Sequence, residues 1–548
     1  MTADIFPKIN RNEWKFVMWI TILVILLTTI PFIYGYFSAP QGKYFTGLQA
    51  LAPGDFNVYY SHIEQVRQGN WIFKDIFTSE THVAFFFNPF WLAVGLFAKI
   101  FKLSNIFTYQ FFRIILTPIF LFTVYFFTSL FFQQIFKRKF CFIFLIFASG
   151  LGSWFSPLVK HIFGTGFSEH YWPMDLWVSE GQNFLTIYHS PHFIFASTLI
   201  LITFILLYFS LEYNNFKYLF YAGTINLFLL FFHPFHLPTI LTVPLVYISA
   251  VSFRDWRIKW DYLLKFIIFI FLSLPAILYQ FLLLIFNPIA QGRASQNICL
   301  TPAIWIVLIS YGFLTPLALY GVFKLKNNYD SKRIFLLVWF ICQSLLIYCP
   351  LLFQRRIAQG LQFPLIIFSC YGLFYFAERF KKIKLFLENI EIFILFFIIL
   401  FASSNIYVLS QDLNYYTYSK NKKYIDYFYI NIENKQAFDW IKGNLDDQDI
   451  ILTYSITGNY IPGFTGKTVY IGHPVETLKF DEKLLKVKEF FGGNQGITKE
   501  KEFLKQNKIS YLFFGQYEQK IGNFNPQDKD YLKQVFHRGE VTIYQVGL

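Results

Sequence analysis

The stretch WKFVMWITILVILLTTIPFIYGY, residues 14–36, decides the class of this protein. Its only charged residue is Lys15, near its start. A helix needs about 20 apolar residues to cross the hydrocarbon core of a bilayer, where the backbone must form its own hydrogen bonds. The stretch has no small-residue cleavage site of the kind that ends a signal peptide. We therefore expect it to be the first membrane helix.

The rest of the chain repeats this apolar pattern. Hydrophobic residues make up 55% of the 548 residues and charged residues only 15%, whereas a soluble domain has about 25% charged residues. We therefore expect a mainly α-helical, polytopic membrane protein. The further apolar runs cover residues 83–101, 106–136, 140–159, 193–211, 216–232, 237–252, 263–286, 302–323, 334–353, 360–377 and 390–409.

The basic residues predict the orientation of the chain. The net charge is +14, but Lys and Arg gather at the ends of apolar runs and in short loops. Cytoplasmic loops carry such an excess, so the charge indicates topology and not a nucleic-acid partner. We expect the protein in the plasma membrane, with its N-terminus in the cytoplasm. Loops 37–82 and 160–192 are then expected to lie outside the cell. The basic clusters lie at residues 8–15, 137–139, 254–259, 324–333 and 381–384.

The number of crossings follows from this orientation. A cytoplasmic N-terminus and an outer C-terminus require an odd number, whereas the apolar runs number twelve with the first. The run 83–101 contains Asn88-Pro89 near its start, so we expect it to re-enter or lie at the interface. About eleven transmembrane helices then remain. The alternative is that the run 106–136 breaks at Pro118 into two short helices.

The composition becomes polar and mixed in charge after residue 410. Apolar periodicity predicts helices at residues 434–445, 479–491 and 498–507 and strands at 449–454, 468–471, 509–514 and 541–546. The sequence thus predicts a membrane module at residues 1–410 and a small soluble α/β domain at 411–548, outside the cell. Residues 458–466 are glycine-rich, but a strand is expected on either side, which argues against a phosphate-binding turn.

The first outer loop carries a candidate catalytic acid. Asp55 follows Pro53-Gly54, and residues 56–68 are amphipathic, which predicts a helix along the membrane surface. A carboxylate there can act as a base or bind a cation; alternatively it caps the helix. The same loop ends with Glu80 and His82, a second acid and imidazole.

The second outer loop and a later helix break supply further polar candidates. Asp175, Glu180 and His192 lie in or beside the loop, and acids with imidazoles permit metal binding or proton transfer. A solvated loop explains them equally well. His233 and His236 lie in FFHPFHLP, where ionisable groups at membrane depth indicate function or a proline-driven kink.

Two adjacent arginines lie on the expected outer side, against the usual distribution of basic residues. Arg355 and Arg356 suit a phosphate or pyrophosphate group, or alternatively anchor to lipid phosphate. Arg113, early in an apolar run, requires a buried acid or a lipid phosphate. The polar groups together fit an enzyme acting on a lipid-linked substrate, and also a transporter.

The order of these motifs resembles the GT-C superfamily of membrane glycosyltransferases. Members have a large first outer loop with an acidic residue, and many have a C-terminal soluble domain. Asp55 occupies the position of that acid. The resemblance covers essentially the full chain. It rests on GDFNVYYSHIEQVRQGNW, FASGLGSW, FFHPFHLP, RRIAQGLQFP and the C-terminal ILTYSITGNYIPGFTGKTVYIGHPVET, residues 54–71, 147–154, 231–238, 355–364 and 451–477.

The resemblance implies transfer of a sugar from a polyprenyl-phosphate donor to an acceptor outside the membrane, usually with inversion. Asp55 would be the general base or hold a metal, and Arg355 and Arg356 would bind the donor phosphate. Glu180, Glu80 and His82 are further catalytic candidates. The other candidate substrate-binding residues are His192, His233, His236 and Arg113.

Metal dependence stays open at this point. The superfamily often has an acid pair two positions apart in the second loop, whereas Asp175 and Glu180 are five positions apart. A divalent cation, Mg²⁺ or Mn²⁺, would have Asp55, Asp175 and Glu180 as its candidate ligands.

Two other functions fit a helical membrane bundle. A transporter or flippase of lipid-linked sugars should show repeated halves, and we find none. A non-catalytic membrane protein with a partner-binding tail would lack the acid. A transferase should instead have Asp55, Glu180 and Arg355 around one outward-facing cavity. The sugar is not indicated, nor whether the acceptor is protein, lipid or glycan.

Overall fold

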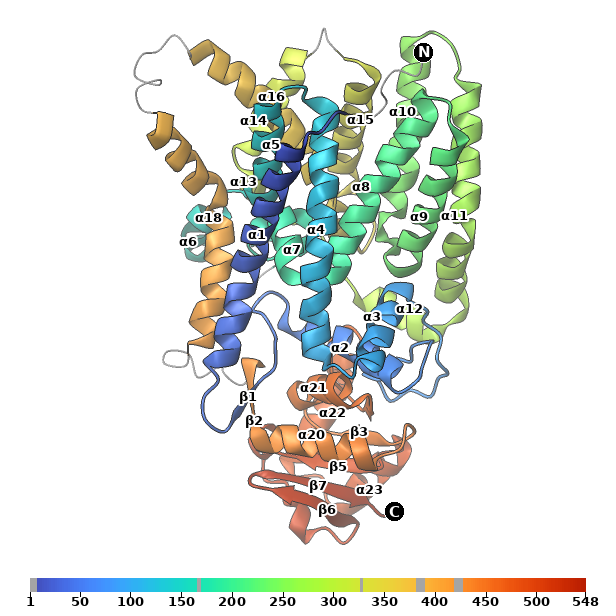
Figure 1. Cartoon of the computed structure of the whole chain (residues 1–548). Helices are drawn as coiled ribbons and strands as arrows, with labels where there is room; N and C mark the ends of the chain where they lie inside the picture. The colour runs from blue at the N-terminus through green and yellow to red at the C-terminus, as the bar shows by residue number, and fades with distance from the viewer. Residues whose placement is uncertain (1–6, 165–168, 326–328, 381–389, 418–426) are drawn as a thin grey trace. The chain divides into compact units, whose positions relative to one another are not determined.

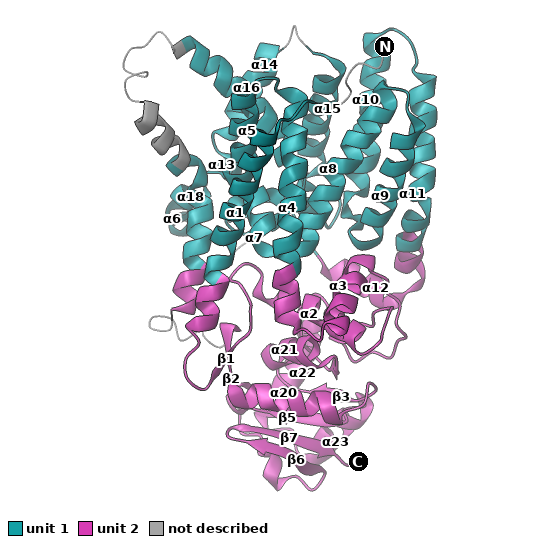
Figure 2. Cartoon of the chain, viewed as in Figure 1, with its two compact units in different colours: residues 1–31, 112–280, 298–411 teal, residues 32–111, 281–297, 412–548 magenta. Residues whose placement is uncertain are grey.

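The computed structural model describes residues 7–164, 169–325, 329–380, 390–417 and 427–548 (Figure 1). The chain forms two compact units (Figure 2). Unit 1 comprises residues 1–31, 112–280 and 298–411, and unit 2 comprises residues 32–111, 281–297 and 412–548. The C-terminal segment therefore shares its unit with the first outer loop and with residues 281–297.

Long apolar helices dominate unit 1. Among the described residues, six helices are long and apolar enough to cross a membrane, or seven if one bent pair counts as a span. The protein is thus a multi-pass membrane protein, while eleven crossings remain a prediction. The six are α1 (Arg11–Phe37), α4 (Asn105–Phe131), α5 with α6 (Ile135–Phe163), α8 (Pro191–Glu212), η3 with α10 (Pro234–Arg254) and α11 (Trp260–Phe286).

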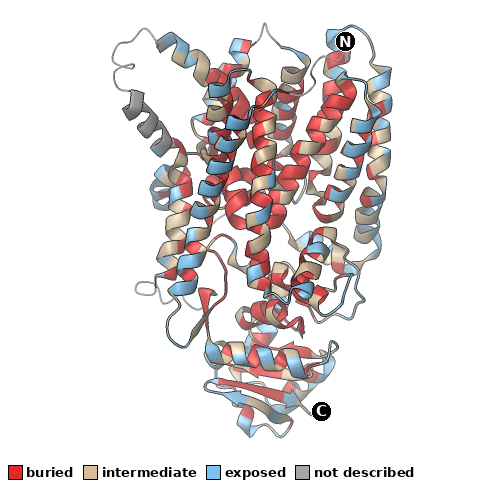
Figure 3. Ribbon diagram, in the orientation of Figure 1, coloured by how far each residue is buried: buried red, intermediate tan, exposed pale blue. Residues whose placement is uncertain are grey.

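The burial of these helices separates a core from a lipid-facing surface. In α8, 83% of the most apolar stretch of 18 residues is buried, and the helix is buried along most of its length (Figure 3). In α11 the corresponding share is only 17%. A helix that is apolar on all sides suits either a protein core or the hydrocarbon of a membrane. We assign α8 to the centre of unit 1 and the apolar face of α11 to lipid.

The remaining helices of unit 1 are shorter, bent or closely packed. The bent pair turns by 82° near Gly312, whose positive φ of 49° ends the first helix. A Cβ on Gly321 would lie 2.1 Å from the carbonyl oxygen of Phe368, so glycine permits close contact between α14 and α16. These helices are α7 (Asn183–His189), α9 (Phe216–Phe232), α13 (Ile304–Tyr311), α14 (Leu314–Leu325), α15 (Ser331–Leu346) and α16 (Gln362–Phe380). The longer α18 (Ile390–Tyr416) ends in unit 2.

The apolar run 83–101 forms only a short helix, in unit 2. The side chain of Asn88 accepts a hydrogen bond from the Trp91 amide, and α3 (Pro89–Ile100) starts there. Its twelve residues rise about 18 Å, less than the roughly 30 Å of a hydrocarbon core. The alternative break at Pro118 is not seen, because α4 runs unbroken through that residue.

The C-terminal segment contributes a five-stranded sheet with the order β4-β3-β5-β7-β6. β3 (Ile450–Leu452) is parallel to β4 (Thr468–Val469) and to β5 (Tyr511–Phe514). β7 (Val541–Val546) is antiparallel to β5 and to β6 (Leu532–Arg538). The helices of this segment are α20 (Ile432–Asn444), α21 (Ser455–Thr465), α22 (Phe480–Gly492), α23 (Ile497–Gln506), α24 (Gln516–Gln519) and η5 (Pro526–Asp528).

The glycine-rich residues 458–466 form a helix, not the predicted turn. A Cβ on Gly458 would lie 1.9 Å from the carbonyl oxygen of Ile471, so this glycine lets α21 approach the backbone that follows β4. Only Gly466, with φ of 71°, has the left-handed conformation, and it ends the helix. The glycines therefore serve packing and helix termination.

The first outer loop and the C-terminal segment are joined by a strand pair and a buried acid. β1 (Lys43–Phe45) pairs antiparallel with β2 (Tyr429–Asn431). Glu64 on α2 (Pro53–Arg67) has a side chain only 1% exposed, and Lys442 of α20 lies 2.6 Å from its carboxylate. Arg67 donates to the same carboxylate over 2.9 Å. A buried charge must be paired, so the contact with Lys442 fixes α2 against α20.

Candidate functional site

Asp55 lies in the first turn of α2 and does not cap it. The helix starts at Pro53, and the capping position is Ala52, with φ of 50° and no side-chain cap bond. A carboxylate in the first turn is favoured by the helix dipole. The Asp55 side chain is 40% exposed, whereas its partner His473 is 9% exposed, with its Nε2 3.0 Å from Oδ1 of Asp55. An accessible carboxylate is thus supported from one side by a buried imidazole.

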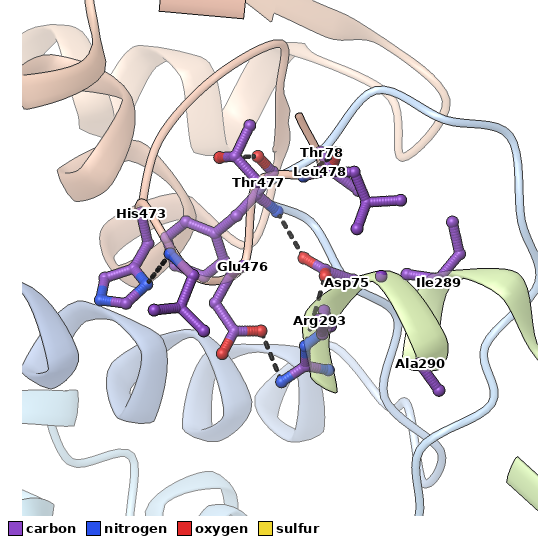
Figure 4. A network of polar contacts seen from close by, with 12 residues as sticks. Asp75, Thr78, Ile289, Ala290, Arg293, His473, Glu476, Thr477 and Leu478 are labelled. Carbon is purple, nitrogen blue, oxygen red and sulfur yellow. Dashed lines mark hydrogen bonds and ion pairs between the residues drawn. The ribbon is translucent and has the colours of Figure 1, made fainter. Parts of the chain in front are cut away.

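The second feature of unit 2 is a buried cluster of two acids and an arginine (Figure 4). Arg293, on α12 (Pro288–Gln296), lies 2.5 Å from Glu476 and 3.6 Å from Asp75. The Asp75 side chain is fully buried and accepts the amide hydrogen of Phe77 over 3.1 Å. Burial outweighs the effect of Arg293 and raises the pKa of Asp75 to about 7.

A small cavity opens beside this cluster. Its space holds about one water molecule. His62, on α2, is buried at its edge, and burial lowers the pKa of its imidazole to about 3. The cavity is lined by Val58, Ser61, His62, Phe73, Lys74, Asp75, Phe77, Phe86, Arg293 and Glu476.

Glu80 and His82 are held by structural contacts in the same unit. Lys483 of α22 donates to the Glu80 carboxylate over 2.8 Å. Burial raises the pKa of Glu80, but Lys483 and the hydrogen bond from Thr78 together lower it below its usual value. The Asp75 amide donates to Nε2 of His82. Nδ1 of His82 must then carry the hydrogen that it shares with the Glu80 carbonyl, 2.6 Å away. The imidazole of His82 is therefore a neutral tautomer, and its two hydrogen bonds hold the loop in place.

In unit 1, the adjacent arginines Arg355 and Arg356 each contact an aromatic ring and an acid. Arg355 and Arg356 lie in η4 (Gln354–Ala358). Arg355 donates to Glu169 over 2.8 Å, and its guanidinium lies 4.2 Å from the ring centre of Trp177. Arg356 lies 4.0 Å from Glu180, a residue of η2 (Ser179–Gly181). Stacked guanidiniums retain bidentate donors, which suits them to a phosphate.

The histidine candidates of unit 1 lie near one another. His233 and His236 share a hydrogen bond of 2.9 Å, and Gln359, beside η4, lies 3.1 Å from His236. The rings of His192 and His233 are 5.9 Å apart, and Ser190 lies 2.6 Å from Nδ1 of His192. These histidines therefore form one buried polar group with the segment that carries the arginines.

Asp175 and Arg113 have contacts that support the fold. Asp175, in η1 (Met174–Leu176), is fully buried and accepts the Gly152 amide at the start of α6 and the Ser404 hydroxyl, over 2.9 and 2.6 Å. Arg113 of α4 donates to the hydroxyls of Thr28 and Thr29 on α1, where we expected an acid or a lipid phosphate. Hydroxyls thus help to satisfy this buried guanidinium.

Within either unit, the described residues form no group of three or more His, Cys, Asp or Glu that could hold a metal. Sequence reasoning missed the cluster of Asp75, Arg293 and Glu476. Arg293 offered a signal, because it is a basic residue between two apolar runs, 263–286 and 302–323, at the ends away from the cytoplasmic basic clusters 254–259 and 324–333. The sequence also assigns no role to His473, because nothing in it places this residue beside Asp55.

Comparisons with known proteins identify the fold. No family model matches the chain, and no curated protein matches its sequence. The oligosaccharyltransferase of Archaeoglobus fulgidus, solved with a tethered acceptor peptide, has a TM-score of 0.50 at 13% identity, covering 92% of this chain and 69% of its own. ArnT of Cupriavidus metallidurans, bound to undecaprenyl phosphate, has a TM-score of 0.50 at 9% identity, covering 96% and 98%. Both neighbours are GT-C glycosyltransferases. This chain therefore has the fold of the GT-C membrane glycosyltransferases.

Proposed function

We propose that this protein transfers a sugar from a polyprenyl-phosphate donor to an acceptor outside the membrane, with inversion at the anomeric carbon. The fold supports a transferase of this kind, since ArnT was solved with undecaprenyl phosphate and the oligosaccharyltransferase with an acceptor peptide. The N-terminus then lies in the cytoplasm and residues 411–548 lie outside, with the protein in the plasma membrane.

The observation that carries the proposal is the environment of Asp55. Its side chain keeps 40% exposure at the start of a helix, and a buried histidine fixes one of its oxygens. As general base, Asp55 takes the proton of the acceptor while the acceptor atom bonds to the anomeric carbon. The bond between that carbon and the phosphate oxygen breaks, and the polyprenyl phosphate leaves with the electron pair.

The arginine pair supports the role of donor binding. A leaving phosphate gains negative charge in the transition state, and preorganised cations stabilise that charge. Arg355 and Arg356 are held in place by aromatic rings, at 4.2 and 4.6 Å, and by glutamates, so they need little reorganisation when a phosphate arrives. His192, His233 and His236 belong to the same region and are our further candidates for donor contact.

The other acids take secondary roles in this proposal. Glu180 is close enough to Arg356 to orient it, while Glu80 is neutralised by Lys483 and is the alternative base in the first loop. The carboxylate of Asp175 is occupied by Gly152 and Ser404, so we give this acid a structural role.

The test uses purified protein in detergent with bacterial lipid extract and a panel of radiolabelled polyprenyl-phosphate sugars. Asp55→Asn should reduce loss of the lipid-linked label by about 100-fold or more, the usual contribution of a general base. Asp481→Asn is the matched control, since Asp481 is also in the first turn of a helix in unit 2, and is exposed.

Three outcomes are informative. Wild-type turnover that Asp55→Asn leaves unchanged would remove Asp55 as the base. Arg355→Ala combined with Arg356→Ala should weaken binding of the donor, so unchanged donor binding would remove the arginines from the site. A wild type that consumes no donor with any added extract would contradict the transferase itself.

A further inference from the structure

The loop that follows β4 reaches the candidate base from the far end of the chain. His473 lies in this loop, residues 472–478, and its Nε2 is 3.0 Å from Oδ1 of Asp55, 418 positions earlier in the sequence. The ring also packs against the turn that starts α2, because a Cβ on Gly54 would lie 3.3 Å from Cδ2 of His473. Gly54 therefore gives the imidazole the space to approach Asp55.

The hydrogen bonds of His473 determine the direction of its contact with Asp55. The amide of Val475 donates to Nδ1 over 3.2 Å (Figure 4). An amide can only donate, so Nδ1 accepts and the hydrogen of the neutral ring lies on Nε2. If the ring gains a second proton, Nε2 still carries its hydrogen. In either state Nε2 donates to the carboxylate of Asp55.

Several contacts hold the loop in this position. Glu476 pairs with Arg293 at 2.5 Å. The hydroxyl of Thr477 donates to the carbonyl of Phe77 over 2.8 Å and accepts the amide of Gly472 over 2.9 Å. These partners lie on the first outer loop, on α12 and within the loop itself. The position of the imidazole is therefore fixed by unit 2 as a whole, not by a flexible tail.

We propose that His473 is the positioning residue of Asp55, which gives the C-terminal segment a direct part in the transferase reaction. This inference rests on the proposed function. The histidine holds one carboxylate oxygen and thereby fixes the direction in which Asp55 meets the acceptor. The 9% exposure of His473 against 40% for Asp55 gives the two residues separate tasks: the acid meets substrate and the imidazole does not.

His473→Phe keeps the ring but removes the donor, and His473→Gln restores an N–H donor near the position of Nε2. With the sugar panel described above, His473→Phe should lower kcat about 100-fold, since misplacing a reacting group by about 1 Å costs that much. KM for the donor should change little, and His473→Gln should recover part of kcat. His537→Phe is the control, because His537 bonds to a hydroxyl on the hairpin of β6 and β7.

A second readout needs no turnover. The protein is labelled with ¹⁵N-histidine and measured in detergent by nitrogen NMR. The signal of His473 is assigned as the one that is lost in His473→Gln, and it should show a hydrogen on Nε2. That signal should shift in Asp55→Asn, while the signals of His537 stay in place.

The two proposals fail in different ways. If Asp55→Asn abolishes turnover and His473→Phe does not, the positioning role is wrong and the transferase stands. An Nε2 signal that is the same in wild type and Asp55→Asn also overturns the positioning role. If the wild type turns over no donor, the transferase proposal fails, and the NMR comparison alone decides whether the two residues are bonded.

Discussion

Replacing Arg293 by Met should destabilise unit 2, because it leaves two acids without their shared cation. Arg293 lies 2.5 Å from Glu476 and 3.6 Å from Asp75, and the exposed fractions of the three side chains are 22%, 13% and 0%. Methionine keeps most of the volume of the arginine stem, so the change tests charge more than packing. Two neighbouring carboxylates then remain in a mostly buried site.

The magnitude follows from the exposure of the pair. Breaking a fully buried ion pair costs roughly 3–5 kcal/mol, and an exposed pair contributes about 0.2–1 kcal/mol. This cluster is mostly buried, so we expect a loss of about 2–3 kcal/mol at pH 8. The loss should be smaller at pH 6, because Asp75, whose pKa burial raises to about 7, can then protonate instead of remaining charged.

The assay is thermal unfolding of the full chain in detergent, followed by fluorescence at one scan rate and one protein concentration. A unit of about 150–250 residues shifts by about 2–4 °C per kcal/mol, so the apparent Tm should fall by about 4–12 °C. Lys501→Met is the control, since Lys501 pairs with Asp530 at 3.0 Å on the surface of the same unit, with exposures of 37% and 75%.

Two results would refute this reasoning. Arg293→Met could change Tm no more than Lys501→Met does, which would mean that the cluster carries no net stabilisation. Alternatively, the double variant Arg293→Met/Glu476→Gln could be as unstable as Arg293→Met alone. Since Glu476→Gln removes one of the two unpaired acids, the double variant should instead recover part of the loss.

Two further predictions concern backbone approach and pH. Gly458→Ala should lower the apparent Tm by the equivalent of about 1–3 kcal/mol, because its Cβ would lie 1.9 Å from the carbonyl oxygen of Ile471. Gly443→Ala in α20 is the control, since its Cβ meets nothing within 4 Å, and it should be neutral or stabilising. Equal Tm values for the two variants would contradict the packing of α21. The pKa of Asp75 is raised to about 7 in the folded protein from 3.8, so the folded state holds a proton that the unfolded state has lost, and stability should fall as the pH rises from about 4 to 7. Asp75→Asn should flatten this fall in a series of Tm measurements from pH 5 to 8, and parallel curves for variant and wild type would show that Asp75 does not titrate there.

The sequence predicted the elements with strong periodicity. The strand at 541–546 coincides with β7, and the amphipathic run 56–68 corresponds to α2 (Pro53–Arg67). In these segments the apolar periodicity lies within consecutive residues, so the sequence alone reveals it. Strand β6 was missed because most of its residues are exposed or half-buried, so it lacks an apolar alternation, although Gly539, with φ of 53°, marks the turn before β7.

The candidate site was harder to predict, for a physical reason. Asp55 is a candidate because a carboxylate after a helix-breaking turn at the membrane surface can act as a base or bind a cation, and Arg355 because of its expected side of the membrane. The partners of these residues come from distant segments, and contacts such as Asp55 with His473 depend on tertiary packing that no local pattern encodes. Glycines illustrate this limit, since Gly458 resembles a turn residue and serves packing.

The pairing of β1 with β2 has a consequence for how the chain is made. Thr46, next to β1, bonds to Tyr427, next to β2, across 381 positions of sequence. At about 5–20 residues per second, the ribosome needs roughly 20 to 80 seconds to supply the second strand. During that time β1 presents an unpaired edge, which other chains can add to. The early segment therefore needs protection from aggregation and proteolysis until residues 429–431 have been made, so unit 2 is completed late although one of its strands is made early.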